Sequence, residues 1–443
     1  MITILSYILI RLFVPKKNYY LEGDELRHIV SARNFYTLWN KSLYDTHPPF
    51  YSWLIKIFKS GVMVSFLCSV GLYLVSSALY SAVGLSPYQK TIALTFLAFN
   101  YTLIYYSNRV FRYQLIALLG TLMIYLLVTH QWIAAGCSWG LLGLTCTFAG
   151  LRGFFAWGLL GINPFVLSLY INIFSSWLLI KAQTYRKNIY HPSGIEGMIE
   201  QVYPFTFKQL LSPLHFPWVH SYYGKKELAF TLKGWMKRVG GIFGLYPPLT
   251  FLVPIAVFVM IRGALVSPLW LSLLVLALLY PSLLKRYLPR NSIIAIPLIG
   301  ILIARGMPQI PLNLVFLGQF GALVGFLLFN RVGMLTKPKI RAFKTSKYLD
   351  KLPKDGVLVD GMICQPIAYW TKKRVVVLSY SPNENDATFE TDLAIKIFNL
   401  NYVVTSKRGE GMKPVYPALD HIKMFKEIKI IHEDNDTYTV YEI

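Results

Sequence analysis

The most unusual side chains in the sequence are the carboxylates of LEGDELRHIV, residues 21–30. This stretch places Glu22, Asp24 and Glu25 close together in a part of the chain that is otherwise poor in acids. No Asp or Glu occurs in residues 46–195, and none occurs in residues 228–349. A carboxylate that is retained in such surroundings could accept a proton from a reacting hydroxyl group, which is the task of a general base.

A purely structural interpretation of the same carboxylates is also open. Gly23 and Asp24 precede a helical pattern of apolar residues, which predicts an amphipathic helix along a membrane surface. In that helix Asp24 would be the N-cap, and Glu25 would be favourable in the first turn. His28 lies four residues after Asp24 on the same helical face, so a divalent metal ion is a further possibility, although these two ligands lack a clear third. No cofactor is certain.

Basic residues at the ends of apolar runs form the second group with possible chemistry. Arg109 and Arg112 lie in SNRVFRYQL, Arg152 lies in GLRGFF, and Lys285 and Arg286 lie in LLKRYLPRN. Each could extend its charge to the membrane surface, since a charge near the bilayer centre is costly. Because acids are so scarce nearby, the anion of a phosphate-bearing ligand is the other partner that we expect, and the guanidinium group suits phosphate oxygens.

The sequence predicts that these residues are carried by membrane helices and by the loops between them. The chain of 443 residues is 55% hydrophobic, and its mean hydropathy is +0.46, which is typical of a membrane protein. Apolar runs of roughly 17 to 25 residues indicate spanning helices. We place such runs, some of them shorter, at residues 1–14, 61–85, 92–107, 113–129, 132–148, 154–180, 241–261, 268–284, 293–304 and 312–330.

Details of these runs complete the predicted topology. We interpret 1–14 as an uncleaved first helix, because it lacks a basic start and a small-residue cleavage site. Asn163 and Pro164 would permit two segments within 154–180 instead of one. The net charge of +23 reflects missing acids, so we expect the lipid bilayer and a phosphate-bearing ligand as partners, and no nucleic acid.

After residue 337 the composition becomes that of a soluble domain. Five short runs, GVLVD, RVVVLSY, NYVVTS, KEIKIIH and TYTVYEI, predict strands. Helical patterns such as ATFETDLAIKIF separate some of them, which favours a small α/β domain with a mostly parallel sheet. We therefore expect two domains: residues 1–337, with a first loop at 15–50 and a long loop at 183–240, and residues 338–443.

The order of the motifs resembles the GT-C membrane glycosyltransferases, in particular the family 39 protein mannosyltransferases and the lipid A aminoarabinose transferases. The resemblance rests on Asp24-Glu25, then HPPF at residues 47–50, then YYSNRVFRYQL, then RYLPRNSIIAIPLIGILIARG. It covers most of residues 15–331. One departure is that Arg112 and Tyr113 stand without the proline of the family's Arg-Pro-Tyr-like motif. The chain also lacks the sugar-binding-like insert domains of the eukaryotic protein mannosyltransferases.

What the resemblance implies is a polytopic α-helical membrane protein of GT-C type, with about 10 to 12 transmembrane helices and the small C-terminal α/β domain. It would transfer a monosaccharide, hexosyl or pentosyl, with inversion, from dolichyl or undecaprenyl phosphate to a hydroxyl group of a lipid, glycan or protein. The enzyme would lie in the plasma membrane, with its active site and C-terminal domain on the extracytoplasmic side.

The resemblance also implies roles for residues. Asp24 would be the general base, and Glu25 would share the catalytic site and orient the acceptor. The donor phosphate would be bound by Arg109, Arg112, Lys285 and Arg286, with supporting roles for His47, Arg27, Tyr287 and Arg152. The main rival interpretation is a transporter or flippase of lipid-linked sugars, which should show paired halves or matching interrupted helices. No such symmetry is visible in the sequence. An inactive relative that acts as a scaffold is a third possibility.

Overall fold

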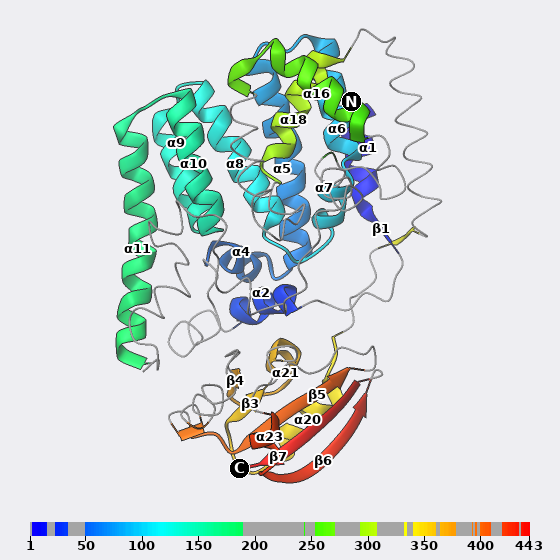
Figure 1. Ribbon diagram of the computed structural model, residues 1–443, viewed down its shortest axis with the longest axis vertical. Helices are drawn as coiled ribbons and strands as arrows, with labels where there is room; N and C mark the ends of the chain where they lie inside the picture. The colour runs from blue at the N-terminus through cyan, green and yellow to red at the C-terminus, as the bar shows by residue number, and fades with distance from the viewer. Residues whose placement is uncertain are drawn as a thin grey trace.

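The protein consists of a bundle of helices above a smaller mixed α/β domain (Figure 1). The computed structural model describes residues 2–15, 23–33, 49–188, 243, 253–270, 293–307, 332–334, 340–359, 364–377, 392, 395–396, 399–408, 419–433 and 436–443. The chain begins at the end of the bundle that lies away from the sheet, and it ends within the sheet.

The helices of the bundle follow the apolar runs of the sequence. Their bounds are α1 Ile2–Leu12, α2 Gly23–Arg33, α4 Phe50–Phe58, α5 Gly61–Ala82, α6 Pro87–Phe99, α7 Tyr101–Ser107, α8 Tyr113–Val128, α9 Trp132–Gly143, α10 Thr147–Leu160, α11 Pro164–Asn188, α16 Val253–Leu265 and α18 Ala295–Gly306. Polar side chains begin several of them. Ser60 accepts a hydrogen bond from the N–H of Met63, and Ser86 forms a capping box with Gln89.

The structure divides two of the predicted runs differently from our expectation. The run 92–107 is two helices, because α6 ends at Phe99 and the side chain of Asn100 caps α7 by accepting the N–H of Leu103. The run 132–148 ends early, at Gly143, and its last residues already belong to α10. At Asn163 the two-segment alternative is confirmed: α10 ends at Leu160, and Pro164 begins α11, where proline is tolerated.

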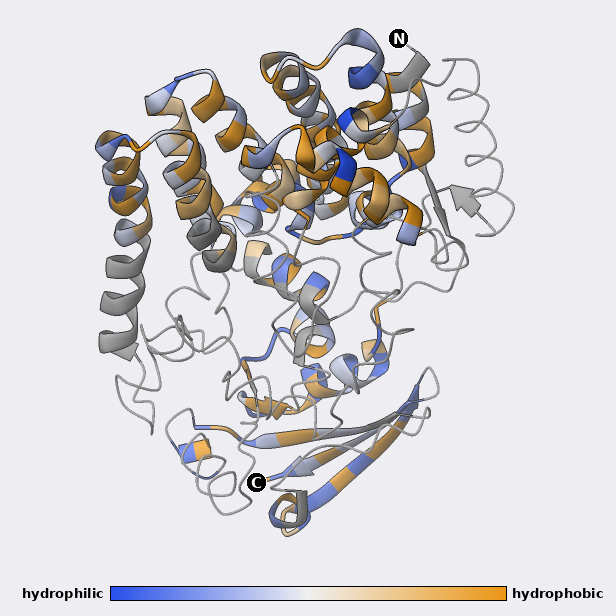
Figure 2. Cartoon of the chain, turned by 45° about the horizontal axis from the view of Figure 1, so that its top comes forward, coloured by the Kyte–Doolittle hydropathy of each residue, from blue (hydrophilic) through white to orange (hydrophobic). Residues whose placement is uncertain are grey.

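Hydrophobic residues predominate along the helices of the bundle (Figure 2), and several of their large apolar side chains are exposed, as expected of an integral membrane protein. Ile133 is 65% exposed, Phe258 is 68% exposed and Leu265 is 80% exposed, and such side chains are solvated well by lipid. Within the described residues one helix, Gly61–Ala82, is long and apolar enough to cross a bilayer by itself, and five apolar helices are shorter. Most of the predicted runs 268–284 and 312–330 lie outside the described residues.

A fully buried arginine ties α1 to the break between α6 and α7. Arg11 donates to Ser69 Oγ at 2.8 Å, to its own helix at Tyr7 O, and to the carbonyls of Leu97 and Ala98 at 3.3 and 3.2 Å. Those two carbonyls lie in the last turn of α6, where intrahelical partners are missing. The guanidinium group also lies 3.4 Å above the ring of Tyr7. Neutral oxygen atoms thus solvate a cation inside the bundle.

The C-terminal domain contains all five strands that the sequence predicts. They are β3 Val357–Val359, β4 Val375–Val377, β5 Tyr402–Arg408, β6 Lys426–Glu433 and β7 Asp436–Glu442, in the order β4-β3-β5-β7-β6. The expectation of a mostly parallel sheet is wrong. β3 pairs in parallel with β4 and β5, whereas β7 pairs antiparallel with both β5 and β6. The two-residue connection between β6 and β7 is too short for a crossover and requires a hairpin.

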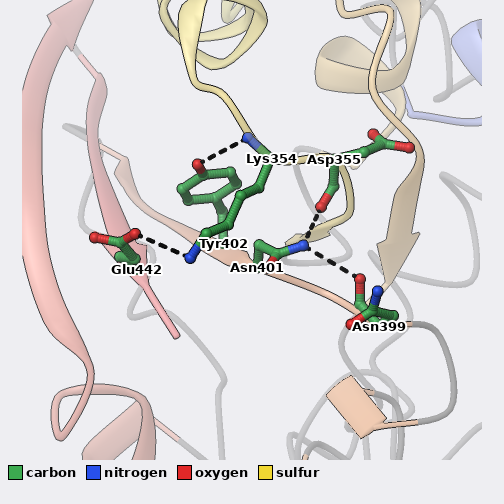
Figure 3. A network of polar contacts seen from close by, with 6 residues as sticks. All are labelled: Lys354, Asp355, Asn399, Asn401, Tyr402 and Glu442. Atoms are coloured by element: carbon green, nitrogen blue, oxygen red, sulfur yellow. Dashed lines mark hydrogen bonds and ion pairs between the residues drawn. The ribbon is translucent and has the colours of Figure 1, made fainter.

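Side chains cover both faces of this sheet. α20 (Phe343–Lys351) and α21 (Cys364–Trp370) contribute to the core on one face, and α23 (Leu419–Ile422) contributes to the core on the other. The predicted helix in ATFETDLAIKIF lies largely outside the described residues. Where β3 and β5 begin, Lys354 N donates to the hydroxyl group of Tyr402 at 3.3 Å and Asn401 Nδ2 donates to Asp355 O at 2.6 Å (Figure 3). These bonds join the start of β3 to the start of β5.

A second, two-stranded sheet connects distant parts of the chain. β1 (Phe13–Pro15) follows α1 directly and pairs antiparallel with β2 (Val332–Met334). The prediction of helix through residue 14 is therefore wrong for Phe13 and Val14. Proline at the end of a strand is compatible with an edge position, because it has no N–H to donate.

Candidate functional site

The Asp24-Glu25 pair lies in the first turn of α2, which crosses the end of the bundle nearest the sheet (Figure 1). Asp24 is the second residue of this helix, so the prediction that it would be the N-cap is wrong. Among the described residues of the bundle, these are the two carboxylates. One face of α2 is buried through Leu26, His28 and Val30, which are 0%, 2% and 8% exposed. The predicted amphipathic helix is present.

Glu25 is fully buried and faces the segment that joins α7 to α8. Its Oε1 accepts the backbone N–H of Val110 at 3.1 Å, and its Oε2 lies 3.9 Å from Arg109 Nη1. Hydrogen bonds to a charged acceptor are shorter and stronger than neutral ones, and a buried carboxylate requires such partners. Arg109, predicted to bind phosphate, therefore has a protein carboxylate beside it, which the scarcity of acids in the sequence did not suggest.

Arg112 lies three residues further on and immediately precedes α8. Its Nη1 donates to the carbonyl of Thr145 at 3.3 Å, at the junction between α9 and α10. Arg109 is held differently, since its guanidinium carbon lies 4.3 Å above the ring of Tyr105 in α7. The two arginines thus belong to one segment, residues 108–112, which we call the arginine loop. It is anchored by Glu25 on one side and by the α9–α10 junction on the other.

The helix after the HPPF motif supports both α2 and the arginine loop. In α4, the hydroxyl group of Tyr51 lies 2.8 Å from Ser65 Oγ and donates to Gly61 O at 3.2 Å. Ser65 Oγ donates in turn to the carbonyl of Phe111. The ring of Tyr51 also contacts the imidazole of His28 edge to face, with centroids 4.9 Å apart. Sequence reasoning missed Tyr51, because nothing local distinguishes it from the other tyrosines.

The C-terminal domain contacts the helix that carries the carboxylates. α21 packs against α2, and Tyr369 contributes to the core of the bundle (Figure 1). The domain is thus placed directly beside the candidate site.

Several predicted site residues cannot be placed. His47, Lys285, Arg286 and Tyr287 lie outside the described residues, and so do the side chains of Asp24, Arg27 and Arg152, whose backbones lie in α2 and α10. Of the predicted residues, the structure brings together Glu25 and Arg109, and Arg112 lies on the same loop as Arg109. Within the described part of the chain, no three His, Cys, Asp or Glu side chains are grouped as a metal site requires. His28 instead packs against Tyr51.

The fold is similar to that of solved oligosaccharyltransferase structures. One of these is the archaeal oligosaccharyltransferase AglB from Archaeoglobus fulgidus, in a complex with an inhibitory peptide and a dolichol-phosphate. It has a TM-score of 0.54 and 11% sequence identity, and the match covers 91% of this chain and 68% of that chain. The oligosaccharyltransferase of the same organism, tethered to an acceptor peptide containing the NVT sequon, has a TM-score of 0.51 at the same identity and coverage.

A further match spans nearly the whole of both chains. ArnT from Cupriavidus metallidurans, bound to undecaprenyl phosphate, has 11% identity and covers 99% of this chain and 96% of that chain, but its TM-score of 0.44 carries no argument. No family model matches the sequence, and no curated protein matches it. The likeness to AglB therefore establishes the fold alone.

Proposed function

We propose that this integral membrane protein is a glycosyltransferase that moves one sugar from a polyprenyl phosphate to a hydroxyl acceptor. The observation that carries the proposal is the position of Asp24 and Glu25, the two acidic residues in the described part of the bundle. They are adjacent in α2, and one of them anchors the loop that contains Arg109 and Arg112. The shared fold supports the proposal, since AglB was solved with a dolichol-phosphate.

Asp24 is the proposed general base. A carboxylate near its reference pKa of about 3.9 is a weak base, so the acceptor proton would move late, as the glycosidic bond to phosphate breaks. General base catalysis contributes roughly 10²- to 10⁴-fold. Direct displacement at the anomeric carbon forms the new glycosidic bond as the bond to phosphate breaks, and it inverts the anomeric centre.

Glu25 has a different proposed role. Because it is fully buried and its oxygens face Val110 N and Arg109, we assign it to positioning the arginine loop. Arg112 and Arg109 would then stabilise the leaving phosphate, together with Lys285 and Arg286. Arg27, His47, Tyr287 and Arg152 remain proposed supporting residues.

The remaining features of the proposal concern the whole molecule. About 10 to 12 helices would span the bilayer, with α2, the active site and the C-terminal domain on the extracytoplasmic side of the plasma membrane. The donor would carry a hexosyl or pentosyl group on dolichyl or undecaprenyl phosphate. The acceptor hydroxyl would belong to a lipid, glycan or protein.

The test is sugar transfer by the purified protein in lipid nanodiscs, with a panel of polyprenyl-phosphate sugars and a mixed acceptor pool. Asp24→Asn should reduce transfer about 100-fold or more, the scale of a general base. Glu22→Gln, which removes a neighbouring acid that precedes the helix, is the matched control and should retain activity. Product from wild type with an undiminished Asp24→Asn would move the base elsewhere. Movement of donor across the bilayer without any product would favour the transporter.

A further inference from the structure

Aromatic side chains gather beside the arginine loop, on α7 and the start of α8. Tyr105 contacts Tyr101 and Tyr106, with ring centroids 6.2 and 5.1 Å apart, and Tyr106 contacts Tyr113 at 4.8 Å. All four tyrosines are half-buried, so each presents part of its surface outward. We call this set the tyrosine platform.

Arg109 joins the tyrosine platform to the carboxylate helix. Its guanidinium group lies over the ring of Tyr105 at 4.3 Å, and its Nη1 lies 3.9 Å from the carboxylate of Glu25. Since Glu25 also accepts the N–H of the next residue, Val110, the arginine loop is held to α2 through its backbone and through the side chain of Arg109. Arg109 thus connects Tyr105 of the tyrosine platform to α2, the helix that contains the proposed general base.

The backbone beneath the platform is held by side chains. α7 has seven residues and would be marginal alone. Asn100 caps its start, Gln114 Nε2 donates to Leu103 O, and Ser107 Oγ donates to Ile104 O at 2.8 Å. Sites that recognise ligands well are held rigid in this way, because the ordering cost is met before binding.

We propose that the tyrosine platform with Arg109 binds the ring of a saccharide during transfer. A pyranose has an apolar C–H face that can lie on an aromatic ring, and hydroxyl groups that can accept hydrogen bonds from a guanidinium group. Tyrosine combines an apolar body with a polar tip, and aromatic walls with a few placed polar groups are typical of small-ligand sites. This inference rests on the proposed function, and the ring could be that of the donor or that of the acceptor.

A membrane-interface belt is the competing explanation for tyrosines in such a protein. A belt contacts lipid headgroups and has no preference for a sugar. Its removal would weaken bare and sugar-bearing lipids equally. The two explanations therefore differ in the ratio of the affinity for a sugar-bearing lipid to the affinity for a bare lipid. Only the saccharide site predicts that a single variant changes this ratio.

The experiment measures dissociation constants for immobilised nanodiscs that contain the full chain. The probes are undecaprenyl phosphate, undecaprenyl phosphate carrying one hexose from a panel, and soluble methyl hexosides. Wild type should bind the matching sugar-bearing lipid, or a methyl hexoside, about tenfold better than Tyr105→Leu does, the scale of one aromatic contact. Affinity for bare undecaprenyl phosphate should stay unchanged. A loss confined to the lipid-linked sugar identifies the donor ring, and a loss confined to the methyl hexoside identifies the acceptor ring.

Two further variants control for folding and for position. Tyr105→Phe retains the ring and should bind as wild type does. Tyr125→Leu changes a tyrosine that is also half-buried but lies near the other end of α8, and it should leave all affinities unchanged. The inference is overturned if Tyr105→Leu retains sugar binding, if it weakens bare undecaprenyl phosphate equally, or if wild type shows no preference for any sugar. Sugar transfer by wild type with an unaffected Tyr105→Leu would reject the platform and leave the proposed function standing.

Discussion

The carboxylate of Glu25 accepts the backbone N–H of Val110 at 3.1 Å, although 85 positions separate the two residues in the sequence. Through this bond the first polar helix of the chain holds the arginine loop. Glu25 belongs to a motif whose acidic members are expected to be catalytic, yet its environment is that of an internal anchor. In the proposed function, positioning and chemistry are therefore divided between Glu25 and Asp24, two adjacent residues of α2.

Substitutions at Glu25 should separate these roles. Glu25→Gln retains an oxygen that can accept the N–H of Val110 but loses the charge beside Arg109, so we expect a loss of about 1 kcal/mol of stability. Glu25→Ala leaves a buried N–H unsatisfied and should cost about 3 kcal/mol. Thermal unfolding in detergent measures both. Equal melting temperatures for the two variants would contradict the assigned anchor.

Arg11 should be essential to the stability of the bundle. Arg11→Met removes the guanidinium donors that serve Ser69 Oγ and the carbonyls of Leu97 and Ala98, and should cost roughly 3 kcal/mol because buried carbonyls are left unsatisfied. Arg11→Lys should be intermediate, since an ammonium group lacks the planar fork of guanidinium. Lys90→Met, which removes an exposed cation from the start of α6, is the control. A stable Arg11→Met would show that the bundle accommodates these carbonyls without Arg11.

The contact between α16 and α18 depends on glycine. A Cβ atom at Gly263 would overlap the backbone carbonyl of Leu302, and one at Gly306 would overlap that of Val259. Backbone atoms cannot yield as side chains do, so Gly263→Ala should push the helices apart at a cost of about 1 to 3 kcal/mol. Gly158→Ala in α10 meets nothing within 4 Å and should be neutral or slightly stabilising. Thermal unfolding of both variants tests this; similar losses would indicate a general intolerance of alanine.

Asp355 should make the protein sensitive to acid. Partial burial raises the pKa of this carboxyl group. Backbone hydrogen bonds from Arg374 and Gly356, together with the charges of Arg374 and Lys373, lower the pKa by more than burial raises it, so the pKa lies below its ordinary value. The charged form therefore stabilises the folded state above the unfolded pKa of about 3.9, and this stabilisation is lost as the pH falls through the folded pKa.

The matching experiment compares wild type with Asp355→Asn. The asparagine oxygen can still accept the N–H of Arg374, which lies 2.9 Å from Asp355 Oδ1, but it does not titrate. The melting temperature of wild type should fall more steeply between pH 5 and pH 2 than that of the variant. Parallel curves would contradict the role of Asp355.

The helices and strands of this fold were easier to predict from the sequence than the pairing of the strands. Most bundle helices and all five strands of the large sheet follow local patterns of hydropathy and β-branching. The prediction of a mostly parallel sheet failed because strand partners are determined by contacts between distant residues, although the short connection before Asp436 is itself a hairpin signal. The break at Asn100 was hidden because apolar residues continue on both sides, while the cap that ends the run is a single polar side chain.

The residues of the candidate site could be predicted from local sequence, but their contacts with distant residues could not. The sequence predicted roles for Glu25, Arg109 and Arg112, because acids are scarce in this part of the chain and the arginines therefore have few acidic partners. It could not indicate that Glu25 and Arg109 lie beside each other, because nothing local to residues 21–30 refers to residues 108–112. The tyrosines of YTLIYYSNRVFRY, residues 101–113, were visible but could not be distinguished from a membrane-interface belt.

The pairing of β1 with β2 has a consequence for chain connectivity. Phe13 is opposite Met334 and Pro15 is opposite Val332, so the exit of the first helix and the entry to the C-terminal domain are adjacent in space. A covalent connection across this point would need few added residues. The segment between these two strands, which contains α2 to α18, thus begins and ends at one place, and a cross-link between β1 and β2 would close it into a covalent loop without moving its helices.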